Sequence, residues 1–147
     1  MLFNIPFSRD IKEVQRNLEK LIRSYLNISF NPFLDIVHEY EHYHVHIDKI
    51  AYLEKCQRVT EVHTTDGDVY RSYRPMYKYQ ELLPESMFFR ISQGAIVNWR
   101  FLKHVKGYRA IIAYGKGDKA QTVDLPISPK VYKFVKGELS LRSSITG

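Results

Sequence analysis

Histidines at alternate positions are the residues of this chain most suited to metal chemistry. The stripe consists of His42, His44 and His46, and His38 and Glu39 come shortly before it. Alternate residues share one face of a β-strand, and imidazole is a ligand for zinc, copper and nickel. No cysteine or carboxylate at motif spacing completes a closed site, so the polar face of a half-buried strand is the competing interpretation. Because histidine titrates near neutral pH, the stripe is also a candidate pH sensor.

The single cysteine, Cys56, is the second reactive candidate. Lys55 and Arg58 lie beside it, and neighbouring cations lower the pKa of a thiol, so redox sensing and an inert thiol are both open. One cysteine cannot form an intrachain disulfide and is typical of a reducing compartment. The chain has no nucleophile elbow, phosphate-binding loop or paired-carboxylate motif, so we expect no catalytic residue, no enzyme and no cofactor.

One amphipathic helix is expected near the N-terminus, between a candidate cap at Ser8 and a stop at Asn27 and Asn31-Pro32. Its apolar residues recur at three- and four-residue steps: Ile11, Val14, Leu18, Leu21, Ile22, Tyr25 and Leu26. A stripe of this width has to be buried, either against the rest of the chain or against a partner.

Short strands are expected from Phe33 onward, where the apolar pattern changes to a period of two. Asp66-Gly67 predicts a hairpin turn between two of them. Pro75 opens a short helix with Tyr79, Leu82 and Leu83 on its apolar side, and Ser128-Pro129 begins a last helix. The predicted strands cover residues 43–47, 50–53, 59–65, 69–73, 88–91, 95–97, 101–105, 108–114 and 121–125. The sequence therefore predicts a mainly β fold preceded by one helix.

Positive charge is concentrated after residue 48. Residues 1–48 hold five Lys/Arg and seven Asp/Glu, which gives a charge of 5 − 7 = −2. The remaining residues hold seventeen Lys/Arg and nine Asp/Glu, which gives 17 − 9 = +8, so the net charge of the chain is +6. A basic region of this size attracts a polyanion. The apolar fraction of 44% excludes general disorder, and the chain has neither a signal peptide nor an apolar run of ~18 residues. We therefore expect a soluble cytoplasmic protein.

Four sequence blocks, in their order and spacing, resemble the LytTR family of bacterial DNA-binding domains. They are Asp48–Glu54, the hairpin at Glu61–Tyr73, Phe89-Arg90-Ile91 followed after three residues by Ala95–Asn98, and Leu125–Ser128. The likeness covers about residues 43–139. It departs from the family pattern at Ser92-Gln93-Gly94 and at Pro129, which stands where arginine commonly follows the last serine. These are loop positions, so the expected fold is unaffected. Base preference is expected to differ, because glutamine favours adenine edges whereas arginine favours guanine.

The resemblance implies an elongated, mostly β module with short helices, whose loops enter successive grooves on one face of DNA. The three loops are Lys55–Arg58, Ser92–Gly94 and Ser128–Lys130. The expected base contacts are Arg58, Gln93 and Ser92, with Lys130 in the minor groove. The expected phosphate contacts are Lys55, Arg100, Lys103, Lys133 and Ser128. Asn98 follows a buried strand, so we expect its side chain to bond the backbone at a turn.

The same resemblance implies a stand-alone transcription regulator that binds paired repeats in double-stranded promoter DNA as a dimer and engages RNA polymerase indirectly. Residues 43–147 would form the DNA-binding domain and residues 1–42 an appendage for docking or dimerisation. The chain length leaves no room for a receiver domain, so we expect control by a partner such as a membrane-bound inhibitor. A metal-binding protein that uses the histidine stripe is the alternative function, and for the N-terminal helix simple packing is the alternative role.

Overall fold

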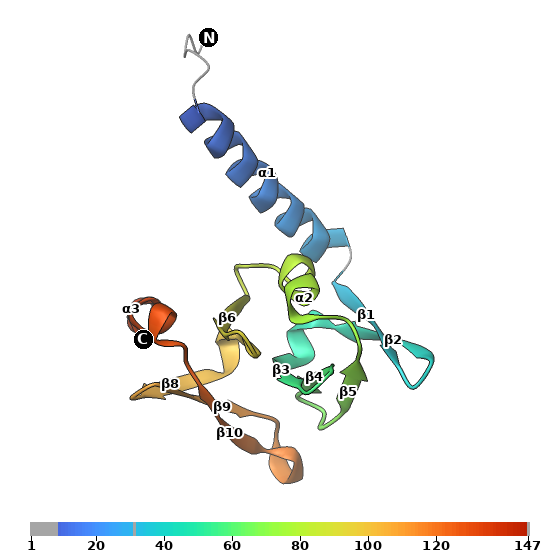
Figure 1. The fold of residues 1–147 in the computed structure, drawn as a ribbon. Coiled ribbons are helices and arrows are strands. Elements are labelled where there is room, and N and C mark those ends of the chain that lie inside the picture. Colours follow the sequence, from blue (N-terminus) through green and yellow to red (C-terminus); the bar gives the residue numbers. More distant parts are fainter. Residues whose placement is uncertain (1–8, 31, 147) are drawn as a thin grey trace. The chain divides into compact units, whose positions relative to one another are not determined.

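The computed structural model describes residues 9–30 and 32–146, which divide after Pro32 into two compact units. The first unit is one helix, α1 (Arg9–Phe30), drawn in blue in Figure 1. The predicted helix is thus confirmed, although it continues past Asn27 to Phe30 and its expected cap, Ser8, lies outside the described residues. Proline restricts the residue before it, so Pro32 is the effective stop. The stripe residues Val14, Leu18, Leu21 and Ile22 are exposed.

The second unit contains ten strands among its described residues, arranged in three antiparallel sheets (Figure 1). A two-stranded sheet pairs β1 (Phe33–His38) with β2 (Glu41–His46). A five-stranded sheet has the order β5-β4-β3-β7-β6, from β3 (Ile50–Cys56), β4 (Val59–Thr64), β5 (Val69–Ser72), β6 (Phe88–Ser92) and β7 (Ala95–Asn98). A three-stranded sheet has the order β10-β9-β8, from β8 (Leu102–Lys106), β9 (Arg109–Tyr114) and β10 (Gln121–Pro126). The mainly β fold class is confirmed.

Two helices and three 3-10 turns complete the second unit. They are α2 (Met76–Leu82), α3 (Pro129–Thr146), η1 (Ile47–Lys49), η2 (Trp99–Phe101) and η3 (Gly117–Lys119). Both helices were predicted, but Leu82 is exposed, whereas Tyr79 and Leu83 are buried. Leu82 is the last residue of α2, and Leu83 follows it with an extended backbone. Among the described residues, no helix has the length and apolarity that a membrane crossing needs.

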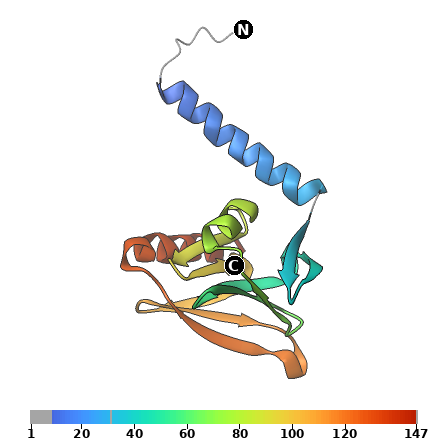
Figure 2. The same cartoon turned by 45° about the vertical axis from the view of Figure 1, so that its right-hand side comes forward.

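The core lies between the five-stranded and three-stranded sheets. Figure 2 shows β8–β10 on one side of the larger sheet and α2 on the other. Alternation along the strands builds this arrangement, since every second residue of β4 and β9 is buried. Side chains of both sheets and of α3 form one cluster: Ala51, Tyr52, Ile91, Ala95, Val97, Trp99, Leu102, Ala110, Ile112, Tyr114, Leu125, Ile127 and Val135. This packing makes the strand ends a rigid platform for the turns between them.

Asn98 ties the end of β7 to the start of the neighbouring strand β3 and to the following turn. Its side-chain nitrogen donates to the Ile50 carbonyl at 2.9 Å, and its side-chain oxygen accepts from the Arg100 amide at 3.0 Å. The structural role predicted for Asn98 is confirmed. The turn that it caps, η2, delays the start of β8 to Leu102, one residue later than predicted.

Candidate nucleic-acid interface

The first two predicted loops meet at one end of the five-stranded sheet. Strands β3 and β7 are antiparallel neighbours with Glu54 opposite Ala95, so the turn after β3 lies beside the turn before β7. The Lys55 amide donates to the Gly94 carbonyl at 2.8 Å, which ties the turns together directly. Gln57 and Arg58 form the first turn, and Gln93 and Gly94 the second. Segments more than thirty residues apart in the chain therefore form one continuous surface.

A shallow hollow of about 420 Å³ lies at this end of the sheet, which we call the loop-end hollow. Its wall includes three cations, Lys55, Arg58 and Arg90, and no carboxylate among the described residues. Gln57, Gln93, Tyr73 and Tyr77 also line it, and Tyr73 is 84% exposed. Guanidinium, ammonium and amide groups bind phosphate oxygens and base edges, and exposed rings offer stacking faces. This combination of groups suits a nucleic acid.

The third predicted loop is attached to the same hairpin. The Ser128 amide donates to the Ile91 carbonyl of β6 at 2.8 Å, and the Ile127 amide donates to the Tyr108 carbonyl at 2.8 Å. Helix α3 begins directly afterwards at Pro129, so Lys130 and Lys133 lie exposed in its first turns. The second predicted loop is thus the turn of the β6–β7 hairpin, and the first and third loops are each hydrogen-bonded to the backbone of this hairpin.

Two predicted phosphate contacts lie elsewhere. Arg100 follows β7 at the end opposite Gly94 and lines a separate hollow together with Lys49, Lys116 and Lys119. Lys103 is exposed on β8, an edge strand of the smaller sheet. The structure therefore groups Lys55, Arg58 and Gln93, places Ser128 and Lys130 on the adjoining loop, and leaves Arg100 apart.

Three aromatic or charged lining residues of the loop-end hollow were missed at the level of the sequence, Tyr73, Tyr77 and Arg90, and Gln57 was placed in the first loop without a role of its own. Arg90 stands inside a block that resembles the family, but its position on a predicted strand indicated nothing about its direction. Tyr77 shares its helix with Tyr79, which is fully buried, and Tyr73 ends a predicted strand, so composition alone favours a core role for both. Only the pairing of β3 with β7 and the position of α2 bring these side chains to the turns.

The histidine stripe does not assemble into a metal site. His42 and His44 are exposed and face Asp35, with ring nitrogens 3.1 and 3.9 Å from its carboxylate oxygens. His46 instead accepts a hydrogen bond from the Asp48 amide at 3.2 Å. Among residues 9–30 and 32–146 the three rings are not part of any set of ligand atoms close enough to hold one ion. The three histidines therefore form the polar face of a strand, and the metal-binding alternative is not favoured.

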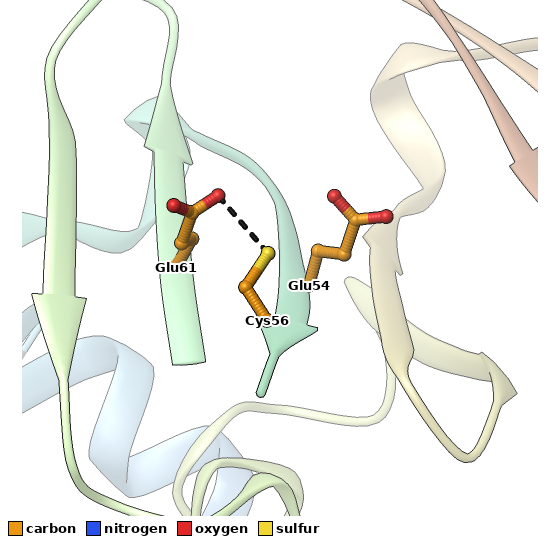
Figure 3. Close-up of side chains that lie close together, drawn as sticks. All are labelled: Glu54, Cys56 and Glu61. Carbon is orange, nitrogen blue, oxygen red and sulfur yellow. Dashed lines mark hydrogen bonds between the residues drawn. The ribbon is translucent and has the colours of Figure 1, made fainter. Parts of the chain in front are cut away.

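Glu54, Cys56 and Glu61 form the one group in the described chain whose ligand atoms all lie within 4.8 Å of one another (Figure 3). The Cys56 thiol donates to Glu61 Oε1 at 3.3 Å, and Arg71 Nη2 lies 2.9 Å from Glu61 Oε2. His63 Nε2 is 3.3 Å from Glu61 Oε1. The Glu61 carboxylate is therefore already engaged by three neighbours from its own hairpin and from β5.

The expectation that cations lower the pKa of Cys56 is wrong. Burial raises this pKa, and the hydrogen bond to Glu61 and the charges of Glu61 and Glu54 raise it further. Strand alternation is the reason, since Lys55 points to the loop-end hollow whereas its neighbours Glu54 and Cys56 point to the opposite face. A thiol with a raised pKa is a poor nucleophile, so the inert interpretation fits the structure.

Comparison with known proteins agrees with this geometry. The family model of the LytTr DNA-binding domain matches residues 40–133, which is more than half of the chain. Among solved structures, the LytTr DNA-binding domain of a response regulator from Bacillus cereus matches with a TM-score of 0.55 and 19% identity, over 70% of this chain and 94% of that one. No curated protein is similar enough to match. The chain belongs to the LytTR family of DNA-binding domains.

Proposed function

We propose that this protein is a transcription regulator that binds double-stranded DNA with sequence specificity through the β6–β7 hairpin and the loops attached to it. The observation that carries the proposal is the loop-end hollow, where three cations and two glutamines from separate strands meet without a carboxylate in its described wall. Lys55 and Arg58 form no ion pair within the described residues, so their charges are available to phosphates, whereas the Arg90 guanidinium is already bonded to Gln80, Ser92 and Gln93. Planar amide and guanidinium groups discriminate base edges. Family membership supports the same partner.

Within this proposal, Arg58 and Gln93 contact base edges in the major groove, because both are exposed in the two adjacent turns. Ser92 has a smaller role, since its hydroxyl oxygen already accepts from the Gly94 amide at 3.2 Å. Lys130 enters the minor groove, where width and potential attract a cation.

Phosphate contacts come from Lys55, Lys133 and Ser128, which lie in or beside the three loops. These contacts set the register of the protein on the duplex without reading sequence. Arg100 and Lys103 contact phosphates only where the duplex extends beyond the loop end, because Arg100 lies at the opposite end of β7.

The wider setting is also a proposal. The regulator binds paired promoter repeats as a dimer in the bacterial cytoplasm, influences RNA polymerase indirectly and is restrained by a partner such as a membrane-bound inhibitor. Residues 1–42 serve docking or dimerisation, centred on α1, whose apolar side chains Val14, Leu18, Leu21 and Ile22 are exposed. Deleting residues 1–30 is expected to change oligomer size or partner capture while DNA binding is kept.

Footprinting and duplex selection test the proposal. The full chain is used to select duplexes from a random-sequence library and to footprint the region upstream of its own gene. We expect an enriched sequence with two spaced half-sites and an affinity that falls steeply with salt. Arg58→Ala and Gln93→Ala should weaken the footprint, whereas Lys119→Ala, which removes a cation from the other hollow, should leave it unchanged. Equal affinity for every duplex would refute sequence-specific binding.

A further inference from the structure

The guanidinium of Arg90 is hydrogen-bonded to the backbone of the β6–β7 turn. Its Nε donates to the Ser92 carbonyl at 3.1 Å, and its Nη2 donates to the Gln93 carbonyl at 2.7 Å. Both acceptors belong to the turn that carries the proposed base-reading side chain. A planar guanidinium offers its donors in a fixed fork, so two successive carbonyls held by one arginine have little freedom to reorient.

The strands on either side of the turn do not pair regularly. The ladder between β6 and β7 shifts register between Arg90 and Ser92, so Ile91 is skipped, and its carbonyl accepts from the Ser128 amide instead. Gln93 lies beyond the last pair of the ladder, in the turn itself. Arg90 donates to the carbonyls of Ser92 and Gln93, because its backbone lies on β6 and its guanidinium reaches forward past the irregular pair.

The same guanidinium is anchored behind the turn. Its Nη1 donates to Gln80 Oε1 of α2 at 3.0 Å, so three of its five N–H donors are engaged with the protein. Arg90 is also part of the wall of two hollows, the loop-end hollow and a second one lined by Gln80, Phe89 and Trp99. It therefore lies between the packed body and the turn and connects them.

We propose that Arg90 is a positioning residue for recognition: it holds the Ser92–Gly94 turn, and through that turn Gln93, in the conformation that binds DNA. The proposal rests on the proposed function for its DNA part. The positioning by Arg90 also affects the other two loops, because the Lys55 amide donates to the Gly94 carbonyl and the Ser128 amide donates to the Ile91 carbonyl, on either side of the turn. Holding this one hairpin in place therefore aligns all three loops.

The first test uses the protein without DNA. ¹⁵N order parameters are measured for the amides of residues 92–95 in the native chain, Arg90→Lys, Arg90→Ala and Gln80→Ala, and thermal melting of each variant confirms folding. Lysine keeps the charge but cannot span both carbonyls, so Arg90→Lys should loosen the turn nearly as much as Arg90→Ala. Gln80→Ala should loosen it less, since the two carbonyl contacts remain. A turn that stays as ordered as in the native chain in both Arg90 variants overturns the proposal.

The second test uses the selected duplex and a scrambled duplex of the same length. Both Arg90 variants should bind the selected duplex about 10-fold or more weakly, because each loses the charged hydrogen bonds that hold the turn. Their affinity for the scrambled duplex and their salt slope should not change. If instead Arg90→Lys behaves as the native chain while Arg90→Ala weakens both duplexes and lowers the salt slope by about 1, Arg90 is a phosphate contact and the proposal is wrong. A native chain that cannot distinguish the two duplexes refutes the regulator function, and the order parameters still decide the role of Arg90.

Discussion

The two faces of the β3–β4 hairpin carry opposite charges and use them differently. On one face Lys55 and the adjoining Arg58 line the loop-end hollow, and neither forms an ion pair with the described residues. On the other face Glu61 is 15% exposed and is bound by Arg71, His63 and Cys56. The faces are only one residue apart along β3, because side chains alternate across a strand.

This difference separates a surface for binding from a surface for stability. A charge whose partners are inside the protein has already exchanged its hydration for protein contacts, and an outside ligand would have to displace them. A cation that remains hydrated and unpaired keeps its whole interaction with a polyanion. Charge count alone therefore does not identify the interface; what matters is which charges are still unpaired after folding.

The largest effect should come from removing Arg58, a cation on the binding face, by which we mean the face of the hairpin that lines the loop-end hollow. Arg58→Ala is expected to cost about 1–3 kcal/mol of specific DNA-binding free energy, because a base contact is lost, without lowering the melting temperature. Glu54→Gln changes a charge on the opposite face of the same hairpin and serves as the matched control. Fluorescence anisotropy with the selected duplex measures both variants. If the two variants weaken binding equally, the faces do not differ in the way argued above.

The next effect should appear in stability. Glu61→Gln removes the charge that holds Arg71, His63 and Cys56, and hydrogen bonds to a charged group contribute more than neutral ones. We expect a loss of about 1–2 kcal/mol in the free energy of unfolding, measured by urea denaturation. DNA affinity of the folded variant should stay at the native value. Weaker DNA binding at unchanged stability would place Glu61 in the interface instead.

Lowering the pH should destabilise the protein through His63, which lies beside Glu61 on the same face of the hairpin. Burial lowers the pKa of His63, and the nearby Glu61 only partly opposes this shift. A histidine whose folded pKa is lowered stays neutral in the folded state while the unfolded chain takes up the proton. Stability should therefore be complete above the ordinary histidine pKa of about 6.5 and decline as the pH falls from there toward the folded pKa. In His63→Gln this decline should shrink, as urea denaturation between pH 7 and pH 5 would show; an unchanged pH profile would contradict the assignment.

Local pattern predicted most of the strands, because alternation and turn residues act over a few positions. The Asp66-Gly67 turn and the alternation around it predict β4 and β5, and the structure confirms both. Ser128-Pro129 predicts the start of α3 in the same local way. The resemblance to the family added what periodicity lacks, namely which turns to consider together.

Long-range pairing supplied the rest of the candidate site. The order β4-β3-β7-β6 places the turn after β3 beside the turn before β7, although three strands and a helix separate them in sequence. No local signal indicates that Arg90 reaches forward to Ser92 and Gln93 or that Tyr73 is exposed. The error over Cys56 has the same origin, because sequence neighbours such as Lys55 were treated as spatial neighbours, whereas alternation sends them to opposite faces.

The smallest effect should come from substituting Gln57, which lies in the turn between β3 and β4. Gln57 has a φ of +59°, in the left-handed region that side chains other than glycine adopt at a cost of about 1–2 kcal/mol. Gln57→Gly relieves this strain but gives the unfolded chain more freedom, worth about 0.5–1 kcal/mol in the opposite direction. The net expectation is a gain in unfolding free energy of up to about 1 kcal/mol, measured by urea denaturation. Gln57→Ala, which keeps the strain and removes the same polar group, is the control. If Gln57→Gly is stabilised yet binds the selected duplex as weakly as Gln57→Ala, the side chain of Gln57 belongs to the binding face. If only the glycine variant binds weakly, the turn conformation matters and the amide does not.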